Sequence, residues 1–108
     1  TFFGYGDLVV DVRSFDRMRR ATQAAVLFDA THAVQQPGRG TAGASGGLRE
    51  AVPALMLAAA GAGVDGFFVE THPDPSRAQS DAETQWPLDQ LEALLRRVLR
   101  VWHAARES

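Results

Sequence analysis

The chain has 108 residues, of which 45% are hydrophobic and 22% are charged, and its net charge is −2. This length allows one domain at most, and the composition is typical of a globular protein. All 11 basic residues are arginine and are balanced by 13 acidic residues, so the charge gives no sign of a nucleic-acid-binding surface. The absence of cysteine excludes disulfides and thiolate chemistry within the chain. No apolar run approaches the roughly 18 residues of a membrane-spanning helix and no signal peptide is visible, so we expect a cytoplasmic protein with no membrane partner.

The first elements are a strand and a short helix. The chain begins at Thr1 without methionine and soon enters an apolar run, which indicates the interior of a longer protein. The run over residues 8–12 predicts a buried strand. Ser14 is a candidate N-cap for a helix over residues 15–20.

The middle of the chain predicts a strand, a long loop and a helix. The strand over residues 25–28 ends at Asp29, and a glycine-rich loop follows over residues 35–47. Loops of this length are usually functional or mobile. A helix is expected over residues 48–62, ended by Gly61 and Gly63, although Pro53 lies inside the pattern. Its apolar face is expected to consist of Leu48, Val52, Leu55 and Ala59.

The last part of the chain predicts a third buried strand over residues 66–70, which ends in Glu70. A polar loop follows. Pro87 suits the first position of a final helix. The apolar stripe of this helix is expected to consist of Leu88, Leu91, Leu95, Val98 and Trp102.

Buried strands that alternate with helices predict a parallel sheet. No G-x-G-x-x-G sequence follows the first strand, so a dinucleotide-binding fold has little support. Three polar clusters lie at the carboxyl ends of the strands, where α/β proteins bind ligands. They are Asp11 with Arg13, Asp29 with His32, and Glu70 with His72. The pattern therefore indicates an α/β protein that forms part of a (β/α)₈ (TIM) barrel.

One imidazole and two carboxylates form a candidate metal site. His32 follows the second strand, Glu70 ends the third, and Asp81 lies in the loop beyond it. Such a donor set suits Zn²⁺, Fe²⁺ or Mn²⁺. By spacing alone, however, a carboxylate at a strand end is more often a hydrogen-bond partner than a metal ligand.

Other polar residues have structural interpretations. We expect Asp29 to accept backbone N–H groups or to orient a neighbouring side chain, and His72 to hold its turn. We expect Arg13 to form an internal salt bridge and His103 to lie on the surface. Ser45 is either the N-cap of the following helix or part of an anion site at the helix start.

Five motifs carry a resemblance to a known family. From about Phe3 to Leu95 they are FGYGDLVVDVRSF, FDATHAVQQPG, ASGGLRE, AAGAGVDGFFVETHPDP and SDAETQWPL. In this order they resemble the C-terminal part of the 3-deoxy-D-manno-octulosonate 8-phosphate synthases (KDO-8-phosphate synthases). The resemblance implies a single (β/α)₈ barrel domain, of which residues 1–108 would form the sixth to eighth βα units.

The resemblance also implies an activity. The family condenses phosphoenolpyruvate with arabinose 5-phosphate to give 3-deoxy-D-manno-octulosonate 8-phosphate and phosphate, for the inner core of lipopolysaccharide. The implied assembly is a homo-oligomer, a tetramer in the family, with no nucleic-acid partner. The family has metal-dependent members, which use a divalent metal such as Zn, Fe or Mn, and metal-independent members with no cofactor.

The family's functional residues transfer to five positions of this chain. His32, Glu70 and Asp81 match the metal ligands, which an N-terminal cysteine of the family completes. His32 and Asp81 thereby become the expected catalytic residues, and His32 would also lie near the phosphoenolpyruvate phosphate. Ser45 matches a serine that contacts the sugar phosphate, and Gln35 is a weaker candidate for a substrate contact. The SDAETQ segment is more similar to the metal-dependent class.

Departures from the family pattern leave two alternatives open. The chain has no lysine, although the family binds phosphoenolpyruvate with lysines from earlier strands, and Gly6 replaces an asparagine. A related synthase of the 3-deoxy-heptulosonate phosphate type is one alternative, although it usually has D-P-S-H where this chain has D-A-T-H. A non-catalytic truncated remnant is the other. Three βα units leave open sheet edges and an exposed apolar face, so we expect the isolated chain to be inactive and poorly folded.

Overall fold

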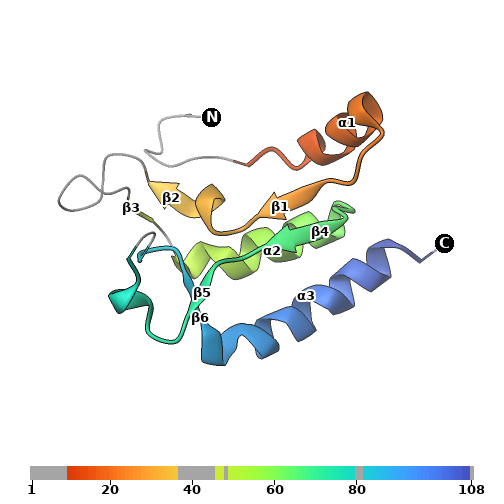
Figure 1. Cartoon of the computed structure of the whole chain (residues 1–108). Helices are drawn as coiled ribbons and strands as arrows, with labels where there is room; N and C mark the ends of the chain where they lie inside the picture. The colour runs from red at the N-terminus through yellow and green to blue at the C-terminus, as the bar shows by residue number, and fades with distance from the viewer. Residues whose placement is uncertain (1–9, 37–45, 48, 80–81, 108) are drawn as a thin grey trace.

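The computed structural model describes residues 10–36, 46–47, 49–79 and 82–107. Its centre is a parallel pair of short strands, β1 (Leu27–Asp29) and β4 (Gly66–Phe68). Helix α1 (Arg13–Thr22) precedes β1, helix α2 (Val52–Gly61) lies between the two strands in sequence, and helix α3 (Leu91–Ala105) ends the chain (Figure 1). The predicted alternation of strands and helices is confirmed from α1 onward.

The pairing of β1 with β4 confirms the predicted parallel sheet for these two strands. Leu27 lies opposite Gly66, and Asp29 lies opposite Phe68. Parallel neighbours require a crossover connection, and α2 is the helix of that crossover. Both strands therefore point the same way, and the segments that follow them emerge at one edge of the sheet.

Only one face of this sheet is covered, which corrects the prediction of strands buried on both faces. Phe28 is buried and Phe67 packs against the same core, whereas Leu27 is 63% exposed and Phe68 is 49% exposed. Side chains alternate between the two faces of a strand. The helices in the described residues lie on the Phe28 side, so the side chains of the opposite face remain open to solvent.

The core lies between the covered sheet face and the helices. Phe15 of α1 meets Phe28 edge to face, with ring centroids 5.8 Å apart. Met56 of α2 and Val98 of α3 are fully buried in the same cluster, and α2 packs along α3 (Figure 1). Burying a side chain of this size stabilises a fold by about 1.5–3 kcal/mol.

The apolar faces of α2 and α3 follow the predictions in part. Val52 and Ala59 are buried as predicted, as is Val98. Leu88 was predicted in the buried stripe of the last helix but is 48% exposed, and Leu94 is buried in its place. The reason is that residues Leu88–Gln90 form a 3₁₀ turn, η4, and α3 begins only at Leu91. A 3₁₀ turn has three residues per turn, which rotates Leu88 out of the α-helical stripe.

The first predicted strand is wrong at Val10, Asp11 and Val12, which lie outside any strand; residues 8 and 9 lie outside the described residues. Helix α1 begins at Arg13, two residues earlier than predicted, so Ser14 lies inside the helix rather than at its N-cap. The N-cap is Val12, and Asp11, one residue before it, accepts the Arg13 N–H with its Oδ1 at 3.0 Å and the Ser14 N–H with its carbonyl.

Helix α2 is shorter than predicted. A 3₁₀ turn, η2 (Arg49–Ala51), precedes it, and Pro53 lies in its first turn, where its missing N–H costs no hydrogen bond. Leu48 lies outside the described residues. The helix ends at Gly61, and Gly63 adopts φ +90°, a left-handed conformation that favours glycine.

The segments predicted as loops contain short strands and turns. Gln35–Gln36 (β2) pairs antiparallel with Gly46–Gly47 (β3), and Thr71–His72 (β5) pairs in parallel with Trp86–Pro87 (β6). Single 3₁₀ turns form at His32–Val34 (η1) and Pro75–Arg77 (η3). The predicted third strand is also shortened, because Val69 and Glu70 follow β4 rather than belonging to it. No helix in the described ranges combines the length and apolarity that a membrane crossing requires.

A charged cluster joins the elements at the opposite, amino end of the strands. Asp65 Oδ2 accepts the Val26 N–H at 2.7 Å and contacts Arg19, while its Oδ1 contacts Arg106 at 3.2 Å. The Val26 N–H and the Arg19 guanidinium, together with the charge of Arg106, lower the pKa of Asp65. Trp102 adds a hydrogen bond from its indole N–H to the Val64 carbonyl at 3.0 Å. This cluster holds α1 and α3 against the sheet and leaves the carboxyl edge free for a site.

Candidate active site

Asp29 and His32 form a tight structure where β1 ends. Asp29 Oδ1 accepts the backbone N–H groups of Thr31 at 3.1 Å and His32 at 3.0 Å. Its Oδ2 lies 2.8 Å from His32 Nδ1. An aspartate that binds backbone groups two and three residues ahead closes a local turn. Both predicted roles of Asp29 are confirmed, because it accepts backbone N–H groups and also contacts the imidazole of His32.

The contact with Asp29 also orients the imidazole. The neutral tautomer that satisfies it carries its proton on Nδ1, which leaves the lone pair on Nε2. Nε2 lies 3.3 Å from Oε1 of Glu70, and the ring stacks on Phe68 with centroids 6.2 Å apart. The imidazole is 42% exposed and the Glu70 side chain 27% exposed, so both are accessible from the open face.

The backbone of Glu70 is held on both sides. Its N–H donates to Thr31 Oγ1 at 2.7 Å, and its carbonyl accepts the Trp86 N–H at 2.9 Å. Glu70 therefore sits between the turn that carries His32 and the strand β6. The structure brings together these two members of the predicted site.

The separation of His32 and Glu70 fits a shared metal ion. Two ligands that each lie about 2.0–2.2 Å from a tetrahedral ion are about 3.3–3.6 Å apart, and Nε2 and Oε1 are separated by 3.3 Å. A histidine ligand usually donates its other N–H to a carboxylate, as Asp29 allows here. The third expected ligand, Asp81, lies outside the described residues, and within the described part of the chain no three metal-binding side chains gather.

The remaining predicted site residues are less defined. Ser45 lies outside the described residues. Gln35 is in β2, three residues after His32, and pairs with Gly47, but only its backbone is described. A substrate contact of the Gln35 side chain therefore stays a prediction.

Three further polar residues have the structural roles that the sequence suggested. Arg13 pairs with Asp11 at 2.9 Å, and this guanidinium lowers the pKa of Asp11 to about 2. His72 Nδ1 accepts the Asp74 N–H at 2.9 Å and so fastens its turn. His103 is exposed on α3.

The contacts of two residues in the site region were not predicted from the sequence. Thr31 is fully buried and binds the Glu70 N–H. Arg49, in the S-G-G-L-R-E motif, donates from Nε to the Gln85 carbonyl at 2.7 Å and from Nη2 to the Ala82 carbonyl. It thereby holds the turn that follows Asp81 in sequence. The position of Thr31 beside a candidate ligand and that of Arg49 in a glycine-containing motif are visible in the sequence. Their hydrogen-bond partners, Glu70 and Gln85, are not, because they lie 39 and 36 residues away in the chain.

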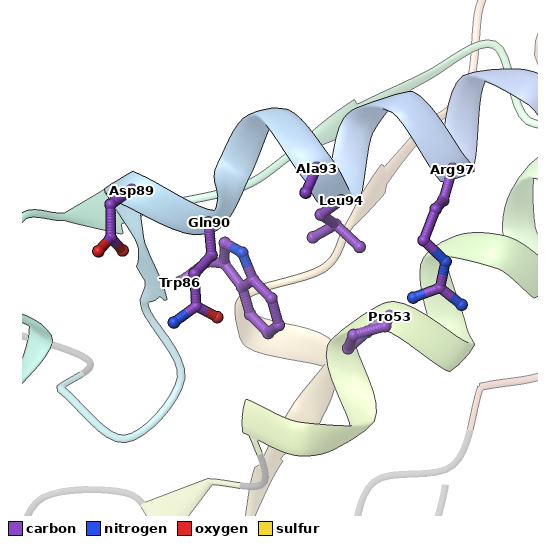
Figure 2. Close-up of a pocket in the computed structure, with 7 residues that line it drawn as sticks. All are labelled: Pro53, Trp86, Asp89, Gln90, Ala93, Leu94 and Arg97. Atoms are coloured by element: carbon purple, nitrogen blue, oxygen red, sulfur yellow. The ribbon is translucent and has the colours of Figure 1, made fainter.

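A hollow of about 330 Å³ lies elsewhere, between α2 and the start of α3. Figure 2 shows Trp86 facing Pro53 of α2, with Arg97 above them on α3. The Trp86 indole nitrogen is buried and has no hydrogen-bond partner among the described residues. The lining comes mainly from the outer helices, whereas ligands of α/β proteins bind at the strand ends, so the hollow is not the candidate site.

Known proteins match almost the whole chain. The model of the DAHP synthetase I family matches residues 1–105. A protein of Nitratidesulfovibrio vulgaris (strain DP4), named 2-dehydro-3-deoxyphosphooctonate aldolase, is 53% identical over 102 residues, which are 94% of this chain and 37% of that protein. Proteins of the same name from Stenotrophomonas maltophilia (strain K279a) and Methylococcus capsulatus are 54% and 57% identical, over 92% and 86% of this chain and 35% and 32% of their own length. The chain thus spans about a third of these relatives and aligns with their carboxyl-terminal part.

Proposed function

We propose, since this chain belongs to the DAHP synthetase I family, that it forms the carboxyl-terminal part of an enzyme that condenses phosphoenolpyruvate with arabinose 5-phosphate. The products are 3-deoxy-D-manno-octulosonate 8-phosphate and phosphate. Support comes from the relatives, which are named 2-dehydro-3-deoxyphosphooctonate aldolases, and from the His32–Glu70 pair at the strand ends. The pair carries the proposal, because its two side chains come from different βα units and meet on the open face.

The proposed fold is that of the family, a TIM barrel, with this chain as the sixth to eighth βα units of its single domain. The open sheet face with Leu27 and Phe68 then faces the barrel interior, and His32 and Glu70 lie at its carboxyl end. The complete enzyme is proposed to be a cytoplasmic homo-oligomer, with the tetramer of the resembled family as the expected state.

The condensation requires the two substrates and the side chains around them to be held in fixed relative positions. C3 of phosphoenolpyruvate forms a bond to the aldehyde carbon of the sugar, water adds to C2, and phosphate leaves as the C2–O bond breaks. Asp29 fixes the imidazole of His32, so that Nε2 lies toward Glu70. His32 is also proposed to lie near the phosphoenolpyruvate phosphate. Ser45 is proposed to contact the sugar phosphate, and Gln35 to add a second substrate contact.

The family includes metal-dependent and metal-independent members, and we propose the metal-dependent class for this chain. His32, Glu70 and Asp81 would hold a divalent ion such as Zn²⁺, Fe²⁺ or Mn²⁺. Such an ion would supply Lewis-acid polarisation of the aldehyde or orientation of the water. Support comes from the 3.3 Å separation of the two described donors and from the support of His32 by Asp29.

The test is a chimera that joins the full 108-residue chain to the amino-terminal part of the Nitratidesulfovibrio vulgaris relative, in place of that protein's aligned segment. The measurement is phosphate release from phosphoenolpyruvate with either arabinose 5-phosphate or erythrose 4-phosphate, and the parent relative is the control. We expect release with arabinose 5-phosphate. Faster release with the four-carbon sugar would instead favour the heptulosonate type of synthase, and a folded chimera inactive with both sugars would favour a non-catalytic remnant.

A further inference from the structure

We propose that Thr31 is a positioning residue that sets the separation between His32 Nε2 and Glu70 Oε1. This inference rests on the proposed function, because it concerns the same pair of side chains. The Thr31 side chain is completely buried.

A fully buried hydroxyl requires a hydrogen-bond partner. Thr31 Oγ1 accepts the N–H of Glu70 at 2.7 Å, across 39 residues of sequence. The residue pair just before this contact continues the sheet ladder, since the Ala30 N–H donates to the Phe68 carbonyl at 2.9 Å. The hydroxyl therefore provides the next cross-strand hydrogen bond, at the point where backbone pairing of β1 and β4 has ended.

This hydrogen bond links two segments that each carry one member of the pair. Thr31 directly precedes His32, and its own N–H is held by Asp29 Oδ1 at 3.1 Å. Glu70 donates its backbone N–H to this hydroxyl, and its carbonyl accepts the Trp86 N–H. Neither segment can shift along the strand direction without breaking this contact. The Nε2–Oε1 separation of 3.3 Å therefore depends on the Thr31 hydroxyl as well as on the two side chains themselves.

The alternative is that Thr31 contributes only to the stability of the fold. Replacement by valine keeps the shape of the side chain and removes the acceptor, which leaves the Glu70 N–H without its present partner. Replacement by serine keeps the acceptor and removes a methyl group. A positioning role predicts that valine and serine differ in their effect on the site, whereas a packing role predicts that both act through stability.

The test uses the chimera and Co²⁺ as the probe. The dissociation constant is measured by titration of the Co²⁺ visible absorption, and thermal unfolding is followed separately. Val98→Ala provides the control, because Val98 is also fully buried but lies on α3. We expect Thr31→Val to weaken Co²⁺ binding by about 10- to 100-fold, the range typical of residues that support metal ligands. Thr31→Ser should restore binding close to that of the unsubstituted chimera, and Val98→Ala should lower the unfolding temperature while leaving Co²⁺ binding unchanged.

Unchanged Co²⁺ binding in Thr31→Val would overturn the proposal, as would an equal loss in Val98→Ala. A chimera that binds no Co²⁺ before any substitution would overturn it too, because no metal pair would then exist to position. The proposed condensation is judged independently, by phosphate release from the unsubstituted chimera. Failure of that activity with the expected Co²⁺ pattern would reject the proposed reaction and keep the role of Thr31.

Discussion

Asp29 Oδ2 lies 2.8 Å from His32 Nδ1, and this contact determines which nitrogen of the imidazole faces Glu70. The same carboxylate closes the turn after β1 by accepting two backbone N–H groups. One side chain thus builds the local turn and orients the residue that is central to the proposed site.

Replacing Asp29 by asparagine should impair the site more than the fold. The amide oxygen of asparagine can still accept the backbone N–H groups, but its NH₂ group requires Nδ1 of His32 to be an acceptor. The proton then moves to Nε2, and the lone pair on the Glu70 side is lost. We expect Asp29→Asn to weaken Co²⁺ binding by the chimera about 10- to 100-fold, with a change in unfolding free energy of about 1 kcal/mol or less.

The matched control for this substitution is Asp11→Asn, since Asp11 also accepts a backbone N–H and pairs with a cationic side chain, but at the start of α1. It should leave Co²⁺ binding unchanged. If both variants bound Co²⁺ as tightly as the unsubstituted chimera, the orienting role of Asp29 would be rejected.

Asp65 should make the fold sensitive to acid. The Val26 N–H and the Arg19 guanidinium lower its pKa in the folded state, so the folded protein binds this proton less readily than the unfolded chain does. Its contribution is therefore present above the unfolded pKa, near 4, and is lost as the pH falls through the folded pKa. We expect Asp65→Asn to lower stability at pH 7 and to reduce the loss of stability between pH 5 and pH 3. Urea unfolding of the chimera and of its Asp65→Asn variant, at pH 7 and between pH 5 and pH 3, measures both changes in stability.

Asp11 again serves as the comparison for Asp65. Its pKa is also low, at about 2, but its partner Arg13 is only two residues away and both side chains are exposed. A local, exposed pair also forms in the unfolded chain and is weakened by solvent. Asp11→Asn should therefore change acid stability less than Asp65→Asn; the opposite order would contradict the account of the Asp65 cluster.

The isolated 108-residue chain should self-associate through α3. An apolar groove on this helix is lined by Leu88, Leu91, Leu95 and Leu99, of which Leu88 and Leu99 are 48% and 44% exposed. Contiguous exposed apolar surface promotes association. Sedimentation velocity should show oligomers that Leu88→Glu with Leu99→Glu shifts toward monomer.

The control for this experiment is Arg100→Glu, an exposed position of α3 outside the groove. It changes the net charge by the same amount as the double leucine variant, so it separates charge repulsion from loss of apolar surface. An equal shift toward monomer in Arg100→Glu would show that the leucines are not responsible.

The sequence predicted the order of the elements from the helix at α1 onward, because apolar periodicity and the residues Gly61 and Gly63 mark their limits. The prediction of Pro87 as the first residue of the last helix is wrong, since Pro87 lies in β6 and α3 begins at Leu91. The sequence-based prediction also failed at Val10–Val12 and at Leu88. An apolar run forms a strand only beside a partner strand, and none pairs with Val10–Val12 in the described residues. The 3₁₀ turn at residues 88–90 follows directly after Trp86 and Pro87, whose pairing with β5 is not visible in the apolar periodicity.

The sequence predicted the residue pair at the site but not the contacts that hold the pair in place. The resemblance named His32 and Glu70, and the structure brings them to 3.3 Å. The contacts of Thr31 and Arg49 were missed, because their partners are distant in sequence and are backbone groups, which no residue type identifies. The expected roles of Asp81 and Ser45 fall on positions outside the described residues and stay predictions.

In the proposed function, this chain supplies one half of a condensing site around His32. The most direct measurement is the rate of phosphate release by the chimera, from phosphoenolpyruvate and arabinose 5-phosphate, before and after His32→Ala. His103→Ala is the matched control, because His103 is an exposed histidine of α3. We predict that His32→Ala lowers the rate at least about 100-fold, while His103→Ala leaves it unchanged. An undiminished rate in His32→Ala would contradict the claim.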